Sequence, residues 1–173
     1  MKRSVLWLIT VAALLSLVNC TSNAQKNETK MKADNPYYSR TDTTKLNVPN
    51  EEWKKILKPE LYYVAREAVT ERSFTGNMWE DETKGSYFCA VCGNPLFKST
   101  AKFTSMCGWP SFFEPLSKDN MIYKEDYSHG MNRIEVECAR CNSHLGHIFD
   151  DGPEPTGKRY CINAISVDFE PEP

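Results

Sequence analysis

Hydrophobic and polar positions first follow the period of helices and then change to the shorter period of strands. Trp53, Ile56 and Leu57 recur at helical spacing on one face, and Asn50 is a candidate N-cap for this segment. Pro59 ends this helix and can start a second one, because proline is tolerated in the first turn of a helix. The sequence therefore predicts two short helices ahead of the main domain.

From about residue 73 onward, short apolar runs are separated by turn residues. The runs predicted as strands are 87–90, 134–137 and 165–168, and the last two alternate apolar and charged residues as half-exposed antiparallel strands do. Glycine and proline occur together at 108–111 and 151–153, which predicts turns there. The domain is therefore predicted to be mainly β.

A strand is also predicted to begin within the segment 159–163, which carries a cysteine. Side chains alternate along a strand, so Arg159, Cys161 and Asn163 are expected to face the same side. The guanidinium favours the thiolate, which is the nucleophilic form of cysteine, and the amide can hold a polar substrate atom beside it. The competing interpretation is a small apolar residue buried in a strand, the usual environment of free cysteine. This segment alone leaves both interpretations open.

Composition narrows the class of protein. A length of 173 residues suits one domain with appendages and allows a sizeable core without disulfides. The formal net charge of −2 offers no basic patch, so we expect no nucleic-acid partner. Ten prolines and eight glycines fit a loop-rich β protein.

The first residues form a targeting signal rather than part of the fold. Two basic residues precede an uncharged apolar run from Val5 to Val18, which is short for a membrane span and typical of a secretory signal peptide. We therefore expect a signal peptide at 1–19, a solvated polar tether at 20–45 and the functional domain at 46–173. The domain is expected to work outside the cytoplasm, in the periplasm or cell envelope.

Two cleavage sites compete in this signal. Leu17-Val18-Asn19-Cys20 resembles a bacterial lipoprotein box, in which Cys20 is lipidated and becomes the mature N-terminus, although Asn19 departs from the usual small residue. Ser22-Asn23-Ala24 offers an ordinary secretory site, and an uncleaved anchor is a third option. The lipoprotein interpretation is preferred because Cys20 has no other evident use. It makes the lipid anchor the only membrane contact that we expect.

Four of the seven cysteines form two pairs, each with a gap of two residues. The pairs are Cys89/Cys92 and Cys138/Cys141. Two such turns together make a tetrahedral thiolate site for one structural Zn²⁺, with no coordination position left open for water. In an oxidising compartment the same cysteines can form disulfides instead. Paired gaps of two on separate strands favour zinc over that alternative.

Cys107 and Cys161 remain unpaired, in the most distinctive segments of the chain. Two free thiols in one small domain suggest a nucleophile and a resolving partner; the alternatives are two unrelated buried thiols or a constitutive disulfide. His144 and His147 lie between them in sequence and suit proton transfer. Asp151 can orient or charge one of these histidines.

Longer motifs then resemble one family, in order along the chain. The motifs are Cys89/Cys92, 107–112 (Cys-Gly-Trp-Pro-Ser-Phe), 129–131 (His-Gly-Met), Cys138/Cys141, 144–149 (His-Leu-Gly-His-Ile-Phe), 151–153 (Asp-Gly-Pro) and 155–163 (Pro-Thr-Gly-Lys-Arg-Tyr-Cys-Ile-Asn). Together they cover about 48–169 and resemble the B-type methionine sulfoxide reductases. Met106 departs from the family, which usually has glycine at that position.

This resemblance implies a fold, an activity and a set of site residues. The implied fold is a β-tent (Mss4-like) of two antiparallel sheets with a structural zinc far from the active site. The implied activity is reduction of methionine-R-sulfoxide, free or in proteins, to methionine. Carried onto this sequence, Cys161 is the nucleophile, Cys107 is the resolving cysteine, and Trp109 and Phe149 bind the substrate, with Trp109 as the apolar wall for its methyl group. The residues that would serve the sulfoxide oxygen and its protonation are His144, His147, Asn163, Asp151 and Arg159.

The resemblance also implies a reducing partner. Attack on the sulfoxide leaves a sulfenic acid on Cys161, Cys107 condenses with it to a disulfide, and an external dithiol reduces that disulfide. The family uses thioredoxin, so for an exported protein we expect a periplasmic or membrane-tethered thioredoxin-like donor. Two other functions compete: a non-catalytic zinc-binding module of the same fold, and a general thiol–disulfide oxidoreductase. The first has no need of Cys161 in its Arg-Tyr-Cys-x-Asn setting.

Overall fold

The computed structural model describes residues 34–75 and 78–172. The chain divides into two compact units, Met1–Pro36 and Tyr37–Pro173, and the second contains the folded domain described below. The predicted signal peptide, both predicted cleavage sites and Cys20 lie outside the described residues. Within the described ranges, no helix combines the length and apolar character needed to span a bilayer.

The two predicted helices are present as α2 (Asn50–Ile56) and α3 (Pro59–Glu67). Trp53 is buried on the inner face of α2, and proline occupies the start of α3, as the sequence indicates. Asn50 is not the cap of α2, since Pro49 holds that position and no side chain caps it. The Asn50 side chain instead accepts a hydrogen bond of 2.8 Å from Arg66 Nε, which ties α2 to α3.

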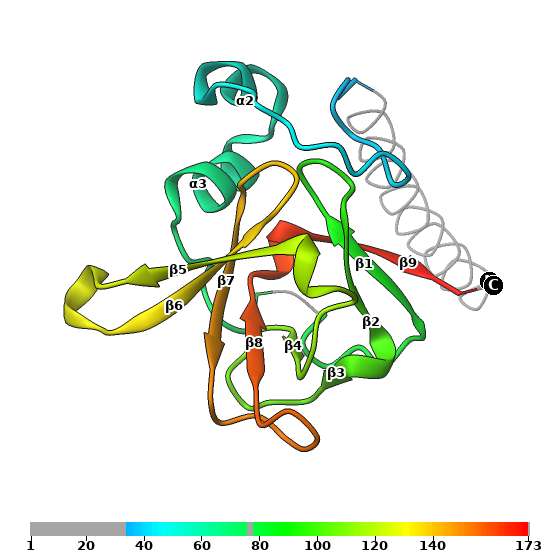
Figure 1. Ribbon diagram of the computed structural model, residues 1–173, viewed down its shortest axis with the longest axis vertical. Helices are drawn as coiled ribbons and strands as arrows, with labels where there is room; N and C mark the ends of the chain where they lie inside the picture. Colours follow the sequence, from blue (N-terminus) through cyan, green and yellow to red (C-terminus); the bar gives the residue numbers. More distant parts are fainter. Residues whose placement is uncertain (1–33, 76–77, 173) are drawn as a thin grey trace, which may run out of the picture. The chain divides into compact units, whose positions relative to one another are not determined.

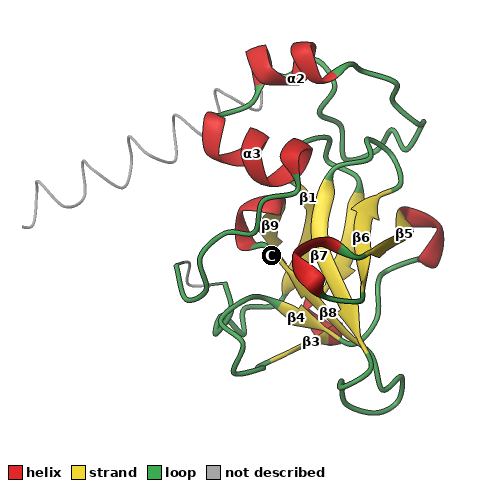
Figure 2. Cartoon of the chain, turned by 90° about the vertical axis from the view of Figure 1, so that its left-hand side faces the viewer, coloured by secondary structure: helices red, strands yellow, loops and turns green. Residues whose placement is uncertain are grey.

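The strands form two antiparallel sheets, which confirms the predicted mainly β architecture (Figure 1). A three-stranded sheet has the order β2-β1-β9, and a six-stranded sheet has the order β3-β4-β8-β7-β6-β5. The strands are β1 (Gly85–Cys89), β2 (Pro95–Lys98), β3 (Lys102–Phe103), β4 (Ser111–Phe112), β5 (Met121–Asp126), β6 (Arg133–Cys138), β7 (His144–Phe149), β8 (Arg159–Ile162) and β9 (Val167–Pro171). Short 3₁₀ helices lie between them: η1 (Ser99–Ala101), η2 (Lys118–Asn120), η3 (Ser128–Gly130) and η4 (Ala164–Ser166). Figure 2 shows α2 and α3 together at one end of the sheets.

Aromatic side chains fill the space between the two sheets. Phe112 on β4 stacks on Phe97 of β2 with ring centroids 4.2 Å apart, and it meets the edge of Tyr87 on β1 at 4.9 Å. All three rings are buried. Because each aromatic ring buries a large apolar area, these contacts hold β4 against the opposite sheet. β4 in turn pairs with β8, so the core fixes the strand that carries Cys161.

The chain from 159 to 169 is not one continuous strand. β8 ends at Ile162, η4 follows, and β9 continues in the other sheet. The Glu71 carboxylate accepts hydrogen bonds from the backbone N–H groups of Ala164 and Ile165, so it satisfies donors that the broken strand leaves unpaired. Asn163 therefore lies just beyond β8, at the N-cap of η4, rather than on the strand face predicted for it.

The half-exposed character predicted for 134–137 is observed only in its first half, since Ile134 and Glu135 are partly exposed and Val136 and Glu137 are buried. β6 lies between β5 and β7, and Glu137 is buried in the middle of the sheet with Lys124 Nζ 2.7 Å from its carboxylate. Glu135 points to His144. The alternation of apolar and charged residues marks two packed faces here, because the acidic side chains have partners that offset their burial.

The folded domain begins earlier than residue 46. Ser39 N–H donates to the carbonyl of Cys92 at 2.9 Å, and Leu46 N–H donates to the carbonyl of Arg140 at 2.7 Å. The buried Arg140 guanidinium donates to the carbonyl of Tyr37 at 2.8 Å. Residues 37–46 therefore run along the cysteine turns, which places the end of the predicted polar tether against the domain.

Gly146 on β7 has no room for a side chain. A Cβ atom built there would lie 2.0 Å from the carbonyl oxygen of Cys161 on the neighbouring strand. We expect Gly146→Ala to force β7 and β8 apart and to lower the free energy of unfolding by about 3 kcal/mol. Gly157→Ala is the matched control, since nothing lies within 4 Å of its Cβ and only the positive φ of 65° opposes it, at about 1 kcal/mol. Equal losses in urea unfolding would contradict the close approach.

Candidate active site

Cys107 and Cys161 lie together at the centre of the six-stranded sheet. Cys161 on β8 is opposite Ser111 of β4 on one side and His147 of β7 on the other. Cys107 lies in the turn that precedes β4, and its Sγ is 3.5 Å from Sγ of Cys161. Both thiols are half-buried and free. This separation allows a thiol–thiolate hydrogen bond now and a disulfide after a small movement.

Hydrogen-bond donors gather around Cys107. Ser105 Oγ lies 2.9 Å and Ser111 Oγ lies 3.5 Å from its sulfur. The hydrogen bond with Cys161, followed by those with the two serines, lowers the pKa of Cys107 to about 4. The protonation of Cys107 is therefore linked to that of Cys161, and the contact favours one proton shared between the two sulfurs.

The same contact acts on Cys161 in the opposite direction. The hydrogen bond to Cys107 and burial both raise the pKa of Cys161 well above its usual range, while the positive charge of Arg159 acts in the opposite direction. The sequence prediction that Arg159 favours the Cys161 thiolate is thus right in sign. Its effect is outweighed by the hydrogen bond with Cys107 and by burial.

A small cavity opens beside Cys161. Its volume is about 100 Å³, and its lining combines apolar rings with polar groups: Thr70, Trp109, Arg133, Gly146, His147, Phe149, Cys161 and Asn163. Five of these residues were predicted as site residues from the sequence. The indole Nε1–H of Trp109 donates to the carbonyl of Glu71 at 3.3 Å, which holds the ring in place.

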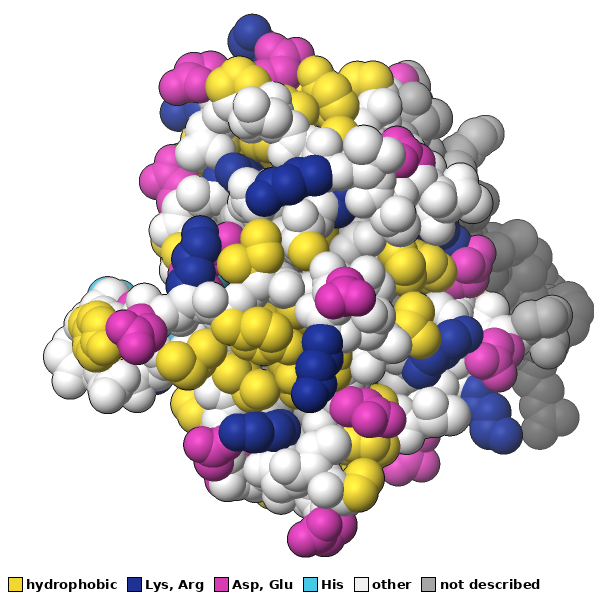
Figure 3. Space-filling model, viewed as in Figure 1, with side chains coloured by type: hydrophobic (Ala, Val, Ile, Leu, Met, Phe, Trp, Pro, Cys, Tyr) yellow, Lys and Arg dark blue, Asp and Glu magenta, His cyan; other side chains and the backbone are white. Residues whose placement is uncertain are grey.

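A larger open groove, of about 650 Å³, contains neither thiol. It is lined by apolar residues such as Leu116, Ile148 and Tyr160 with Lys118 and Lys158 among them. On the face shown in Figure 3, apolar side chains likewise lie among interspersed basic and acidic ones. Volume alone therefore does not locate the chemistry of this domain.

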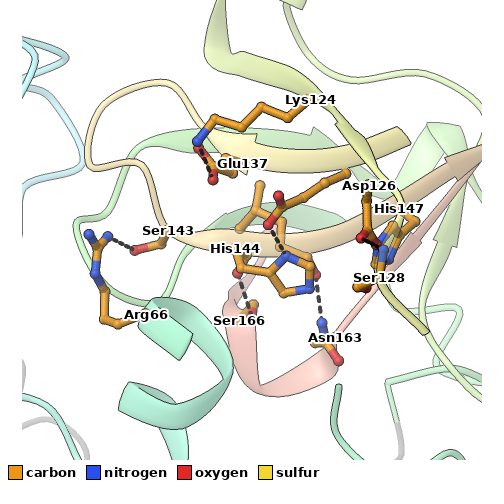
Figure 4. A network of polar contacts seen from close by, with 12 residues as sticks. Arg66, Lys124, Asp126, Ser128, Glu137, Ser143, His144, His147, Asn163 and Ser166 are labelled. Atoms are coloured by element: carbon orange, nitrogen blue, oxygen red, sulfur yellow. Dashed lines mark hydrogen bonds and ion pairs between the residues drawn. The ribbon is translucent and has the colours of Figure 1, made fainter. Parts of the chain in front are cut away.

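The two histidines have different polar partners (Figure 4), and only one of them lines the cavity. His147 lines it, and its Nε2 lies 2.8 Å from Oδ2 of Asp126. His144 does not line the cavity; its Nδ1 lies 2.6 Å from Oε1 of Glu135. The two rings are 5.4 Å apart. Only His147 is therefore in direct reach of a ligand in the cavity.

Asp151 does not contact either histidine. Its carboxylate accepts two hydrogen bonds of 2.8 Å from Arg159, in a bidentate pair. The Arg159 guanidinium also lies 4.4 Å from the centroid of the Phe149 ring. Asp151 therefore orients Arg159, and the carboxylates that orient the histidines are Asp126 and Glu135.

The Asn163 amide is engaged with the backbone on both sides. Its Nδ2 donates to the carbonyl of Leu145 at 3.0 Å, and its Oδ1 accepts from the N–H of Glu71 at 3.0 Å. These bonds join β7 to the segment that carries Thr70 and Glu71. Asn163 thus shapes the cavity wall, and one amide hydrogen remains for a ligand.

Sequence reasoning missed Thr70, Asp126, Arg133 and Glu135. Strand pairing brings the last three to the histidines, since Asp126 is opposite Arg133 and Glu135 is opposite His147. The one available signal was Glu135, a charged residue within the apolar alternation of 134–137. A charge on a strand next to a histidine-bearing strand is a candidate partner once the register is known.

The four remaining described cysteines form a separate cluster. The Sγ atoms of Cys89, Cys92, Cys138 and Cys141 all lie within 4.8 Å of one another, and the residues are buried. Both pairs adopt the same turn, closed by a residue with positive φ: Gly93 at 80° and Asn142 at 56°. Four buried thiols in this arrangement can hold a metal ion.

Comparison with known proteins agrees with this site. The SelR domain matches residues 57–171. The "Peptide methionine sulfoxide reductase MsrB" of Methanosarcina barkeri is 58% identical over 122 residues, which cover 70% of this chain and 86% of that protein. The proteins of the same name from Thiobacillus denitrificans and Pseudomonas fluorescens are 54% and 53% identical, and the matches cover 70% and 73% of this chain and 92% and 98% of those proteins. The chain therefore belongs to the SelR-domain family of MsrB peptide methionine sulfoxide reductases.

Proposed function

We propose that this chain reduces the R epimer of methionine sulfoxide to methionine, with Cys161 as the nucleophile and Cys107 as the resolving thiol. Family membership supports the reaction and its role in repair of oxidised proteins. The observation that carries the residue assignment is the pair of free thiols 3.5 Å apart, beside a cavity that Trp109 and His147 line.

The first step transfers oxygen from the substrate to Cys161. The proton shared by the two thiols moves onto Cys107, and the Cys161 sulfur then bonds to the sulfoxide sulfur as His147 donates a proton to the oxygen. The oxygen leaves with Cys161 as a sulfenic acid, and methionine is released. The substrate sulfur gains two electrons and Cys161 loses two. The sulfur contact supports this route because it provides Cys161 with a base.

The second step forms the disulfide. The Cys107 thiol attacks the Cys161 sulfenic acid, an S–S bond forms and water leaves. A thioredoxin-like dithiol then reduces the disulfide by exchange and is itself oxidised. Cys107 suits the resolving role because it is partly exposed and already in contact with Cys161.

The substrate side chain is assigned to the cavity beside Cys161. Trp109 and Phe149 supply apolar surface for the methyl group, while His147 and Asn163 face the position of the sulfoxide oxygen. Arg159 and its partner Asp151 lie next to Phe149 and act on the charge of Cys161. His144 acts through the ring of His147.

Zinc is the metal proposed for the four-cysteine cluster. Tetrahedral thiolate zinc with Zn–S bonds of about 2.3 Å places its sulfurs about 3.8 Å apart. The sulfurs of Cys89 and Cys141 are 3.7 Å apart, and those of Cys92 and Cys138 are 3.6 Å apart, which fits that geometry. The ion would supply structural cross-linking only, because four thiolates leave no open position.

We also propose that residues 1–19 are removed and that Cys20 is lipidated, which places the folded domain in the periplasm or cell envelope. The support is the apolar run and the cysteine that follows it.

Cys161→Ala is expected to lower turnover of the R-sulfoxide more than about a thousandfold, because the nucleophile is lost. Cys107→Ser is expected to release about one methionine per chain and then stop as the sulfenic acid, since no disulfide forms. Separated R and S sulfoxides, with a thioredoxin donor, measure both. Steady cycling of either variant contradicts the assignment, and faster reduction of insulin than of sulfoxide favours a general oxidoreductase.

Cys92→Ser is expected to lose the bound zinc and to lower the free energy of unfolding by more than about 4 kcal/mol, because a structural metal is coupled to folding. Metal analysis and urea unfolding measure this. Cys107→Ser is the matched control and should retain one zinc per chain. A stable, metal-free wild-type protein would argue against the zinc site.

Growth with labelled palmitate is expected to label the mature protein in cells with lipoprotein processing. Cys20→Ala should abolish the label without changing the folded domain. An unlabelled wild-type protein would refute lipidation and favour cleavage after Ala24.

A further inference from the structure

Asp126 joins the cavity histidine to an arginine. Its Oδ2 lies 2.8 Å from His147 Nε2 and 2.6 Å from Arg133 Nη2, and its Oδ1 accepts the N–H of Ser128 at 2.9 Å. Both oxygens are therefore fixed, and the carboxylate has one orientation. The Ser128 hydrogen bonds first, and then those of His147 and Arg133, lower the pKa of Asp126, so it remains charged throughout the working pH range.

These three residues come from three adjacent strands. Asp126 ends β5, Arg133 begins β6 opposite it, and His147 lies on β7. Figure 1 shows the β5–β6 hairpin extending beside β7. Arg133 and His147 also line the cavity beside Cys161, whereas Asp126 does not. Asp126 is thus placed to act on the reaction only through its two neighbours.

The contact determines which nitrogen of His147 can serve the substrate. A charged carboxylate accepts hydrogen bonds only, so His147 Nε2 carries a proton and donates it to Asp126. Nδ1 has no hydrogen bond with any described residue and is the nitrogen left for a ligand in the cavity. After Nδ1 gives up its proton, the neutral ring keeps Nε2–H bonded to Asp126. This is the state that a general acid must reach.

We propose that Asp126 is a positioning residue that holds His147 with Nδ1 toward the sulfoxide oxygen, and that Arg133 tunes this effect by sharing the same carboxylate oxygen. The inference rests on the proposed sulfoxide reduction and deepens it. Neither Asp126 nor Arg133 was assigned a role by sequence reasoning.

Other charged or titratable groups also face His147. They are Arg133 and Glu135 on β6, His144 on its own strand and Cys161 on β8. Burial lowers the pKa of His147, the hydrogen bond with Asp126 raises it in part, and the charge of Arg133 lowers it. Asp126 and Arg133 therefore act on the acid in opposite directions.

Asp126→Asn tests the positioning role. A positioned general acid contributes about 10²–10⁴-fold, so we expect kcat for the R-sulfoxide to fall at least about tenfold while KM changes by less than about threefold. The basic limb of the kcat profile should move to lower pH, because His147 loses the charge that favours its protonated form. Glu125→Gln is the matched control: it removes an exposed carboxylate from the adjacent position on β5, and among the described residues its side chain hydrogen-bonds to Tyr127. It should leave kcat and the pH profile unchanged.

Arg133→Gln separates positioning from a loss of structure. Removing the competing cation leaves Asp126 free to act on His147, so the basic limb should move to higher pH, opposite to Asp126→Asn. A simple loosening of the hairpin would move both profiles alike. Nitrogen NMR of His147 should show the Nε2–H form in the wild type and a lower pKa of the ring in Asp126→Asn, without any need for turnover.

These experiments separate a failure of the proposed sulfoxide reduction from a failure of the positioning role of Asp126. Wild-type protein that does not reduce the R-sulfoxide would overturn the proposed function. An active wild type with an unchanged kcat and pH profile in Asp126→Asn would overturn the positioning role alone, as would an Nδ1–H tautomer in the wild type.

Discussion

The two cysteine turns are the constraint on which the rest of the domain depends. Cys89 closes β1 and Cys92 precedes β2, in the three-stranded sheet; Cys138 closes β6 and Cys141 precedes β7, in the six-stranded sheet. Holding the four sulfurs together therefore joins the two sheets at the ends of β1 and β6. His144 follows Cys141 by three residues, so the same point fixes where the histidine strand begins.

Charge sharing between the two thiols then sets the chemistry of Cys161. The contact between the sulfurs lowers the pKa of Cys107 and raises that of Cys161, so the protonation of the two thiols is linked. Arg159 supports ionisation of Cys161, but Asp151 binds its guanidinium bidentately and moderates that field. The two sulfurs are 3.5 Å apart, so a proton can move between them without a separate base.

The histidines show how a buried sheet accommodates polar groups. Each ring has one carboxylate partner, Glu135 of the adjacent β6 for His144 and Asp126 of β5 for His147, so burial is offset by a charged hydrogen bond. One ring faces the cavity and the other packs behind it. Two histidines that look equivalent in a His-Leu-Gly-His segment are thus given different roles by strand pairing.

Local patterns in the sequence determined the two helices, the mainly β class, the two cysteine pairs and the special character of Cys107 and Cys161. Each of these depends on residues close together in the chain: helical spacing at 53–57, a proline at 59, gaps of two between cysteines. The tertiary structure alone decided the interruption after Ile162, the burial of Glu137, the pairing of Asp151 with Arg159 instead of a histidine, and the place of Asp126 and Arg133 at the site. Those features depend on register between strands that are distant in sequence, and a shift of one residue would reverse the face of every side chain. The proton on the Cys107–Cys161 pair belongs to the same group, because it is set by a distance between two sulfurs separated by 54 positions in the chain.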